Sequence, residues 1–423
     1  MNILIIGSGG REHALGWKLK QSPDVEKVYF SPGNGGTSLV GENVNIGVLE
    51  VDKLREFAIE NEIGFTVVGQ EASLEVGIVD SFTRAGLAIF GPTKSAARLE
   101  TSKVFIDQLL EKHDIPRPKS VAVDNIEDGL SYIKNRDPNS YVIKADGLAT
   151  GKGVILPESE EQARRELTNM MSGESFGKAG ESVVFQEKLV GQEVSAFALS
   201  DGKNIVMLPF FQDHKQAYDG DTGPNTGGMG AYTPIPFLTD EIKQKIRTEI
   251  MQRTVDGMKA DGHEYRGVVY AGLFVNGDDV KVIEFNARFG DPECQPMMMA
   301  LEEDLFPLLQ QSAAGEFTQT EIKTSSDAIA TVCLASGGYP LEYEKGKEIF
   351  GLDNVTDLDV VVFHAGTKLE NKKFYTNGGR VLNVSARADS MKAALDKAYS
   401  QIGEDGIHFD QMHYRTDIGF RVL

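Results

Sequence analysis

The segment DVKVIEFNARFGDPECQP, residues 279–296, carries the polar pattern with the clearest chemistry. In an extended strand alternate side chains share a face, so Val282, Glu284 and Asn286 are predicted to lie on one side. A carboxylate and an amide oxygen suit Mg²⁺, which often takes only one or two protein ligands and the rest from phosphates and water. Arg288, at the next position of that face unless the strand has ended, could stabilise charge on a transferring phosphoryl group. A solvated edge strand is the alternative, and the Arg-Phe-Gly-Asp-Pro run that follows argues against it.

A second candidate for phosphate chemistry is KADGLATGKGV, residues 144–154. Lys144 is predicted on a strand, and Lys152, between Gly151 and Gly153, lies in a glycine-rich loop that can fold over a polyphosphate. The spacing differs from that of a P-loop, no Ser or Thr follows the lysine, and a strand follows where a P-loop has a helix. A plain glycine hairpin with an exposed lysine remains open on this segment alone.

Acidic residues flank a turn in QEKLVGQEVSAFAL, residues 186–199. Backbone groups of such a link can read the edge of an adenine, and the carboxylates of Glu187 and Glu193 can accept hydrogen bonds from ribose hydroxyls. Acidic residues at a turn are more often simply solvated, so this pattern is weak by itself.

The N-terminal loop GSGGREH, residues 7–13, follows an apolar run and opens a helix. Its backbone N–H groups and the helix dipole can bind a phosphate. A dinucleotide site is disfavoured, because Glu12 stands where the third small residue belongs and SPGN, residues 31–34, stands where an acidic residue is needed. A tight turn that requires glycine for its geometry is the alternative.

The loop QDHKQAYDGDTGPNTGGMGAY, residues 212–232, is long and rich in glycine and polar groups. Long ordered loops of this kind are usually functional. Asp213, His214 and Lys215 could bind a polar substrate, whereas His214 lacks the spacing partners of a zinc site.

Alternating apolar runs and helical segments in the first 92 residues predict a parallel α/β sheet. The periodicity of residues 94–113 predicts one connecting helix, which Pro116 and Pro118 end. We therefore expect a multidomain chain of α/β and α+β class, with an N-terminal α/β domain (1–100), a middle domain (101–326) that includes a small movable lobe at about 119–190, and a small mixed C-terminal domain (327–423).

The overall composition excludes several functional classes. The formal net charge of −20 repels polyanions, so neither nucleic acid nor an anionic membrane surface is an expected partner. Cys294 and Cys333 are too few for a disulfide scaffold, which fits a reducing compartment. No run approaches the roughly 18 apolar residues of a membrane span, and the N-terminus lacks a signal-peptide pattern. A cytoplasmic protein is expected.

Taken together, these motifs and the helix around Lys103 strongly resemble the phosphoribosylamine-glycine ligase family of the ATP-grasp superfamily, over nearly the whole chain. RFGDPECQP and GPNTGGMGAY are specific to that family, whereas the glycine loops are shared more widely. The resemblance implies an ATP-grasp core with a mobile lid. It also implies that ATP phosphorylates glycine and that the amine of 5-phosphoribosylamine attacks the glycyl phosphate, giving glycinamide ribonucleotide, ADP and phosphate in de novo purine biosynthesis.

The resemblance also implies roles for individual residues, and it implies a monomer. The nucleotide would be bound by Lys103, Lys144, Gly151, Lys152, Gly153, Glu187, Leu189 and Glu193. Magnesium or manganese would be held by Glu284 and Asn286, while Arg288 and Asp291 would line the glycine and acyl-phosphate site. The ribosylamine would be bound by Gly9, Gly10, Arg11, Glu12, Asn34, Asp213, His214, Lys215, Asn225 and Gly228.

One departure from the superfamily concerns the strand GVVYAGLFV, residues 267–275, which offers no second metal-binding acid. A full two-metal site is therefore in doubt. Three rival functions remain at this point: another ATP-grasp carboxylate ligase such as a carboxylase subunit, a nicotinamide-dependent oxidoreductase, and a non-catalytic nucleotide-binding regulator.

Overall fold

The structure is a computed structural model that describes residues 1–146, 154–172 and 182–423. Its N-terminal part is a parallel sheet of order β3-β2-β1-β4-β5, as the alternating pattern predicted. The strands are β1 (Asn2–Gly7), β2 (Lys27–Pro32), β3 (Glu42–Asn43), β4 (Ile63–Val68) and β5 (Ile89–Phe90). The helices are α1 (Gly10–Leu19), α2 (Thr37–Val40), α3 (Val51–Glu60), α4 (Glu71–Glu75) and α5 (Ile78–Arg84). Ile3 and Ile5 enter one hydrophobic core and Leu4 and Ile6 another, because helices cover both faces of a parallel sheet.

The connection to the middle of the chain contains two helices, α6 (Arg98–Thr101) and α7 (Lys103–Lys112). The prediction of one helix over 94–113 was wrong at Ser102, whose backbone is extended and whose hydroxyl accepts a hydrogen bond from the Phe105 amide at 3.2 Å. A serine in that geometry caps a new helix, and helical periodicity alone does not reveal such a restart.

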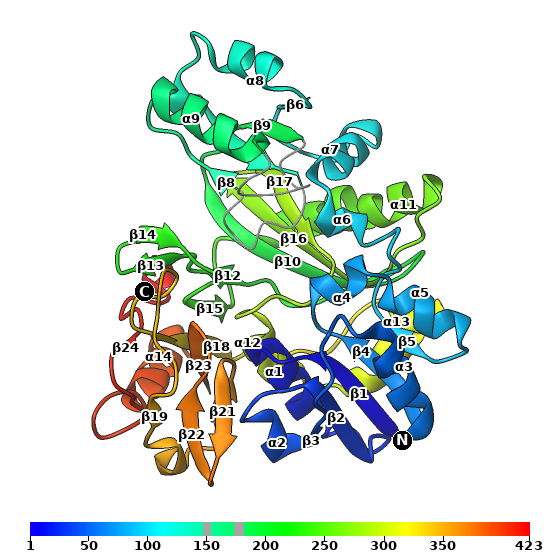
Figure 1. The fold of residues 1–423 in the computed structure, drawn as a ribbon, viewed down its shortest axis with the longest axis vertical. Coiled ribbons are helices and arrows are strands. Elements are labelled where there is room, and N and C mark those ends of the chain that lie inside the picture. The colour runs from blue at the N-terminus through cyan, green and yellow to red at the C-terminus, as the bar shows by residue number, and fades with distance from the viewer. Residues whose placement is uncertain (147–153, 173–181) are drawn as a thin grey trace.

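A small lobe projects from the rest of the molecule at the top of Figure 1. Its antiparallel sheet has the order β6-β9-β7-β8, with strands β6 (Ser120–Val123), β7 (Tyr141–Ala145), β8 (Val154–Ile155) and β9 (Val183–Glu187). The helices α8 (Ile126–Ile133) and α9 (Glu160–Met171) complete it, with a short 3₁₀ turn at Pro138–Ser140. Ile143, Leu167 and Phe185 belong to a core of its own, so the lobe can move as a unit.

The central sheet is antiparallel, with the order β11-β10-β16-β17. Its strands are β10 (Gln192–Asp201), β11 (Ile205–Met207), β16 (Arg266–Asn276) and β17 (Asp279–Asn286). One face packs against α7 and against a continuous helical stretch composed of α10 (Asp240–Lys245), a π-helical segment (Ile246–Gln252) and α11 (Arg253–Ala260). The other face packs partly against α13 (Leu305–Ala314), through Phe197, Leu199 and Val268 in a second core, and also carries polar side chains such as Glu284.

The C-terminal sheet has the order β12-β15-β18-β23-β20, and β24 also pairs with β18. Its strands are β12 (Gln212–Asp213), β15 (Gly230–Thr233), β18 (Ala328–Ser336), β20 (Val360–His364), β23 (Arg380–Ala388) and β24 (Met412–His413). Smaller elements are β13 (Gln216–Tyr218), β14 (Thr222–Asn225), β19 (Glu348–Ile349), β21 (Thr367–Glu370), β22 (Lys373–Thr376), α14 (Met391–Ser400) and 3₁₀ turns at Leu352–Asn354 and Phe420–Val422. The two ends of the segment 212–233, β12 and β15, therefore pair into this sheet, whereas β13 and β14 form a separate two-stranded sheet; our assignment of the segment to the middle domain stays a prediction.

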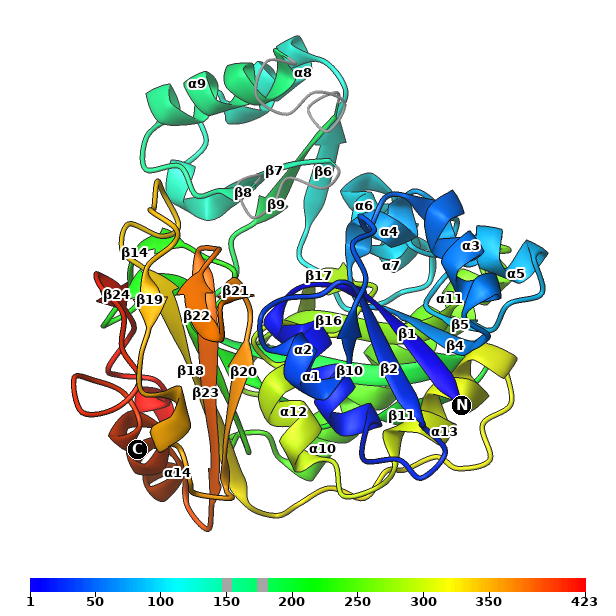
Figure 2. The ribbon, with the colours of Figure 1, turned by 60° about the horizontal axis from the view of Figure 1, so that its bottom comes forward.

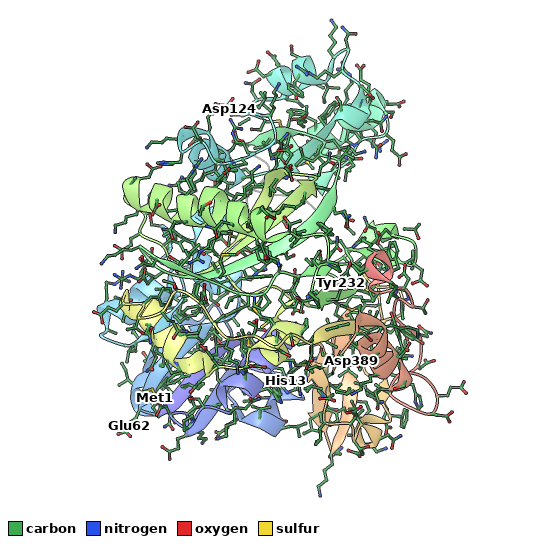
Figure 3. All side chains as sticks on the ribbon, turned by 180° about the vertical axis from the view of Figure 1, so that it is seen from behind. Met1, His13, Glu62, Asp124, Tyr232 and Asp389 are labelled. Carbon is green, nitrogen blue, oxygen red and sulfur yellow. The ribbon has the colours of Figure 1, made fainter. Side chains whose placement is uncertain are left out.

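The N- and C-terminal parts meet across α1 and α12 (Cys294–Ala300), which is followed by α13 (Leu305–Ala314). Figure 2 shows both helices between the N-terminal strands and β20, and Figure 3 places His13 of α1 at this junction. Within the described ranges, no helix has the length and apolar character that crossing a bilayer requires.

Candidate active site

Strand β17 contains a β-bulge at Ile283. Glu284 is the register partner of Gly272, whereas Val282 is the partner of Leu273, so Ile283 has no partner of its own in β16. The extra residue shifts the alternation of side chains by one position. Val282 is consequently fully buried on the opposite face from Glu284. The prediction that the two share a face was wrong, because strict alternation does not continue across a bulge.

The bulge leaves Glu284 and Asn286 together on the polar face and also anchors a lysine. A Cβ on Gly272 would lie 3.0 Å from the Cγ atom of Glu284, so glycine leaves the room that this carboxylate occupies. The Nζ atom of Lys144, from β7 of the lobe, donates a hydrogen bond to the carbonyl of Ile283 at 3.0 Å. One irregularity in one strand therefore orients the carboxylate and positions Lys144 beside it.

Three lysines gather around Glu284. Burial alone would raise the pKa of Glu284, but Lys215, Lys144 and Lys103 outweigh burial and leave that pKa lowered. The ammonium of Lys215 lies 2.9 Å from a carboxylate oxygen of Glu193 and 3.9 Å from one of Glu284. Burial lowers the pKa of Lys144 to about 8 against the pull of Glu284. An otherwise acidic chain thus concentrates positive charge at one place, which suits a polyphosphate.

A cleft opens beside Lys103 and Lys144, between the lobe and the central sheet. Its polar lining residues are Lys103, Asp107, Lys144, Gln186 and Glu284. Its remaining walls include the apolar side chains of Ile106, Leu110, Val154, Val184 and Ile283. An apolar cleft with a few convergent charged groups is the usual form of a nucleotide or small-molecule site.

The residues expected around adenosine lie at the link between β9 and β10. Glu187 is exposed and accepts a hydrogen bond from the Lys119 amide at 3.3 Å, while Leu189 and Glu193 are half-buried. The expected lid residues Gly151, Lys152 and Gly153 lie outside the described residues.

Arg288 follows the end of β17 and is held by two carboxylates. Its Nη2 atom lies 3.1 Å from Glu100 and donates to the Asn286 amide oxygen at 3.1 Å, and its Nε atom donates to Glu71 at 3.3 Å. Burial opposes the charge, but Glu100 and Glu71 outweigh burial and raise the pKa of Arg288. We did not predict Glu71 or Glu100 from the sequence. Glu71 comes two residues after the predicted parallel strand FTVVG, at the edge where ligands bind in such sheets. Its position after that strand could have identified it as a site residue.

Asp291 is fixed by an arginine from the C-terminal sheet. The Nη1 atom of Arg380 donates to the Asp291 carbonyl at 2.6 Å and to the Gly227 carbonyl at 2.6 Å, and Nη2 lies 3.5 Å from the Asp291 carboxylate. Gln295 donates to the same carboxylate at 2.9 Å. Burial would raise the pKa of Asp291, yet it is lowered, mainly by Arg380. No local motif marks Arg380, since it reaches the site only through the pairing of β23.

Two further predicted residues lie in the neighbouring turn. Gly228 has a φ of +110°, and a Cβ there would come within 2.4 Å of the Pro292 ring, so this position requires glycine. Asn225 is exposed at the end of β14.

In the N-terminal loop, the Glu12 carboxylate binds groups of the loop itself. The Gly9 amide donates to the Glu12 carboxylate at 2.6 Å, and the Nε atom of Arg11 contacts the same carboxylate at 2.6 Å. Arg11 also donates to the Phe289 carbonyl at 3.1 Å, which links this loop to the segment after β17. Glu12 is fully buried and caps α1, so the Gly9 amide already has an anionic partner.

Gly10 and Asn34 are packed against the C-terminal part. A Cβ on Gly10 would lie 2.5 Å from Gln295 and 2.6 Å from Asn383. The Asn34 side-chain amide donates to the carbonyls of Ser8 at 2.9 Å and His364 at 2.8 Å. These two predicted substrate residues thus also bind the N- and C-terminal parts to each other.

The residues 213–215 point in alternating directions. Burial raises the pKa of Asp213 to about 7 against the effect of Lys215, and Glu293 adds to the rise. Glu293 itself accepts hydrogen bonds from Ser195 at 3.1 Å and Tyr270 at 2.8 Å, and we did not predict its place beside the site. His214 is fully buried and turned away, toward the C-terminal residues.

Comparison with known proteins matches three family models along the chain. They are described as phosphoribosylglycinamide synthetase N domain, at residues 1–100, ATP-grasp (A) domain, at 101–294, and C domain, at 329–421. The phosphoribosylamine-glycine ligase of Yersinia pestis is 46% identical over 427 residues, covering 100% of this chain and 99% of that protein.

Solved structures agree with this result. The phosphoribosylamine-glycine ligase of Thermotoga maritima superposes with a TM-score of 0.85 at 33% identity, over 99% of this chain and 100% of that one. The biotin carboxylase domain of the Hydrogenobacter thermophilus 2-oxoglutarate carboxylase, solved with MgADP and bicarbonate, has a TM-score of 0.74 at 13% identity, over 98% and 91% of the two chains, and shares the fold. Three matched domains and full-length similarity show that this chain belongs to the phosphoribosylamine-glycine ligase family of ATP-grasp ligases.

Proposed function

We propose that this chain ligates glycine to 5-phosphoribosylamine through a glycyl phosphate, giving glycinamide ribonucleotide, ADP and phosphate, with the residues described above dividing the work. The observation that carries this proposal is the convergence of three lysines, the Glu284–Asn286 pair and Arg288 beside one cleft. Cations for a polyphosphate, oxygen ligands for a hard metal and an arginine for a migrating phosphoryl group are the components of phosphoryl transfer to a carboxylate.

ATP is placed in the cleft between the lobe and the central sheet. Lys103 and Lys144 face its phosphates, and the link that carries Glu187, Leu189 and Glu193 faces its adenosine. The lobe has a core of its own and can close over the nucleotide; the predicted lid residues around Lys152 lie outside the described residues. Closure of the lobe excludes water, which would otherwise hydrolyse an acyl phosphate.

Glu284 and Asn286 fit a divalent metal of the magnesium or manganese type. The lowered pKa of Glu284 keeps it ionised, and the Asn286 amide oxygen keeps a lone pair beyond its bond from Arg288. No cluster of three or more His, Cys, Asp or Glu suited to a metal occurs in the described part of the chain, so nucleotide phosphates and water must complete the coordination. The surrounding lysines would repel a free dication, and the metal is therefore expected to enter with the nucleotide. When bound, it would neutralise charge on the phosphoryl oxygens.

Arg288 and Asp291 are assigned to glycine and its acyl phosphate. The guanidinium of Arg288 carries fixed charge at the polar face of β17, and Asp291 is kept ionised by Arg380. The ribosylamine is assigned to the surface between Gly10, Arg11 and residues 213–230. No side chain of the enzyme needs to act as nucleophile, because the attacking amine belongs to the substrate.

The decisive experiment measures ADP release with glycine and phosphoribosylamine together, and traps the acyl phosphate with hydroxylamine when the amine is left out. We expect ADP release with the pair and glycine hydroxamate with hydroxylamine, both dependent on a divalent metal. Glu284→Gln provides the control for activity of a contaminating enzyme. No release with the pair, but release with bicarbonate, would overturn the proposal in favour of a carboxylase.

A monomer is the assembly we propose, since each assigned residue is supplied by one chain. Sedimentation equilibrium at micromolar concentration tests this assignment. A dimer whose dissociation abolishes turnover would contradict it.

A further inference from the structure

The end of the chain lies along the loop that carries Asp213 and Lys215. We define residues 413–421 as the C-terminal tail and residues 213–221 as the substrate loop. Figure 1 shows the C-terminus drawn beside β13 and β14, which belong to this loop and its continuation. The Thr416 amide donates to the Asp219 carboxylate at 2.9 Å, so tail and loop are joined.

Asp221, near the end of the loop, is the hub of these contacts. Its carboxylate accepts hydrogen bonds from Arg415 at 2.8 Å and Arg421 at 2.6 Å, and lies 3.4 Å from the His214 Nδ1 atom. These contacts hold the pKa of Asp221 well below its usual range. The residue has a φ of +53°, in the left-handed region that aspartate enters more readily than most other non-glycine residues.

His214 connects the beginning of the loop to the tail. Its Nε2 atom accepts a hydrogen bond from the Gly419 amide at 3.0 Å, so the proton of the neutral ring lies on Nδ1, toward Asp221. The fully buried ring lies between Tyr232 and Phe420, at centroid distances of 5.9 Å and 5.5 Å. This histidine has no free edge for a substrate, and its contacts all hold the loop.

Arg421 spans both ends of the loop with one guanidinium. Its Nη1 atom donates to the Asp213 carbonyl at 3.1 Å, while its Nη2 atom binds Asp221. Arg415 holds the middle, donating to the Gln216 carbonyl at 3.3 Å, and is itself fixed by two bonds to Asp417 at 2.7 Å and 2.8 Å. The two arginines thus bind the loop through backbone carbonyls at its first residue and its middle, and through the Asp221 side chain at its end.

We propose that Arg421, with Asp221, is a positioning residue that sets the backbone of the substrate loop so that Asp213 and Lys215 face the reaction site. Alternation along this segment sends His214 toward the tail and Lys215 to the opposite side, where its ammonium contacts Glu193 and Glu284. The Asp213 carboxyl is on that side as well, within electrostatic reach of Lys215 and Glu293. The inference rests on the proposed function, which assigns Asp213 and Lys215 to the substrate.

The test compares Arg421→Ala, Arg421→Lys and the matched control Arg387→Ala. Arg387 also binds carboxylates of the C-terminal part, Asp327 and Asp359, but lies outside the tail and the loop. We expect Arg421→Ala to lower kcat about tenfold or more, because a displacement of about 1 Å in a positioned group can cost about a hundredfold. ADP affinity should stay within about twofold of the wild-type value. Arg421→Lys should recover part of kcat, since one ammonium cannot reach both the Asp213 carbonyl and Asp221.

Two further variants separate this inference from the proposed function. Full turnover in both Asp213→Asn and Lys215→Ala would remove these residues from the site and with them the proposed assignment. Loss of turnover in those two variants, with wild-type kcat in Arg421→Ala, would overturn the positioning role alone. The positioning role would also be overturned if Arg421→Ala and Arg387→Ala lost the same fraction of kcat and that loss were proportional to the decrease in unfolding temperature of each variant. If Arg421→Ala does not fold, an unchanged kcat in Arg421→Lys decides against the role.

Discussion

Replacing Arg288 by lysine tests the assignment of phosphoryl transfer most directly. The guanidinium contacts Glu100, Asn286 and Glu71 through two different nitrogens, at 3.1, 3.1 and 3.3 Å. A lysine keeps the charge, so the buried Glu100 is not left without a cation, but one ammonium cannot occupy both nitrogen positions. The substitution therefore removes the two-nitrogen contact geometry of the guanidinium and keeps its positive charge.

The expected magnitude follows from the donors lost. Removing one positioned donor from a developing oxyanion costs about 2.7–4 kcal/mol, or about a hundredfold to a thousandfold in kcat. We expect Arg288→Lys to lower kcat by about a hundredfold and to change ADP affinity by less than about threefold, because the proposed function assigns the ground-state nucleotide mainly to Lys103 and Lys144.

The assay couples ADP release to a spectrophotometric readout, with ADP affinity measured by calorimetry. Arg253→Lys is the control, since Arg253 donates to the exposed Asp114 carbonyl, at 2.8 Å, away from the site, and should keep wild-type kcat. A kcat within about threefold of wild type in Arg288→Lys, or a loss of ADP affinity as large as the loss of kcat, would refute the reasoning.

Three other predictions concern the metal, the acid stability and the thiols. Glu284→Gln should lower metal-dependent turnover by orders of magnitude, and an unchanged metal titration would count against the site. Burial lowers the pKa of His13 to about 3 and of His364 to about 4, below the unfolded value of about 6.5, so the unfolded chain binds protons first and stability falls as pH drops below about 6.5. In urea unfolding between pH 7 and 5, each histidine should contribute a slope that approaches about 1.4 kcal/mol per pH unit by pH 5, while the raised pKa of Asp213 contributes in the opposite direction. The slope should be smaller in His13→Asn than in the wild type, and equal slopes would contradict this account. Burial raises the pKa of both thiols, that of Cys333 to about 12. Iodoacetamide should therefore label Cys294 and Cys333 only after unfolding, and labelling of either cysteine in the native protein, detected by mass spectrometry, would contradict this.

Much of the architecture follows from local patterns. The alternation of apolar runs and helical segments predicted the parallel N-terminal sheet, and the fold class was confirmed. The spacing of Glu284 and Asn286 predicted that these two oxygen-bearing side chains share one strand face, and the strand register agrees. Such predictions succeed because side-chain period and glycine-rich turns are properties of a few consecutive residues.

Errors arose where a local pattern is interrupted. Strict alternation placed Val282 beside Glu284, but the extra residue at Ile283 turned it into the core. Helical periodicity carried one helix through Ser102, where a hydroxyl cap begins a second. Both interruptions depend on the partner strand or on a hydrogen bond that periodicity does not contain.

The sequence by itself determined the chemistry of this protein: lysines near a glycine loop, a carboxylate and an amide on one strand, and an arginine after it. Only the tertiary structure decided which other residues position these side chains. Glu71 and Glu100 reach Arg288, Arg380 reaches Asp291, and Arg421 reaches the Asp213 backbone, each from an element distant in the chain. The physical reason is that burying a charge requires a partner, and the fold, through long-range strand pairing and helix packing, determines which partner is near.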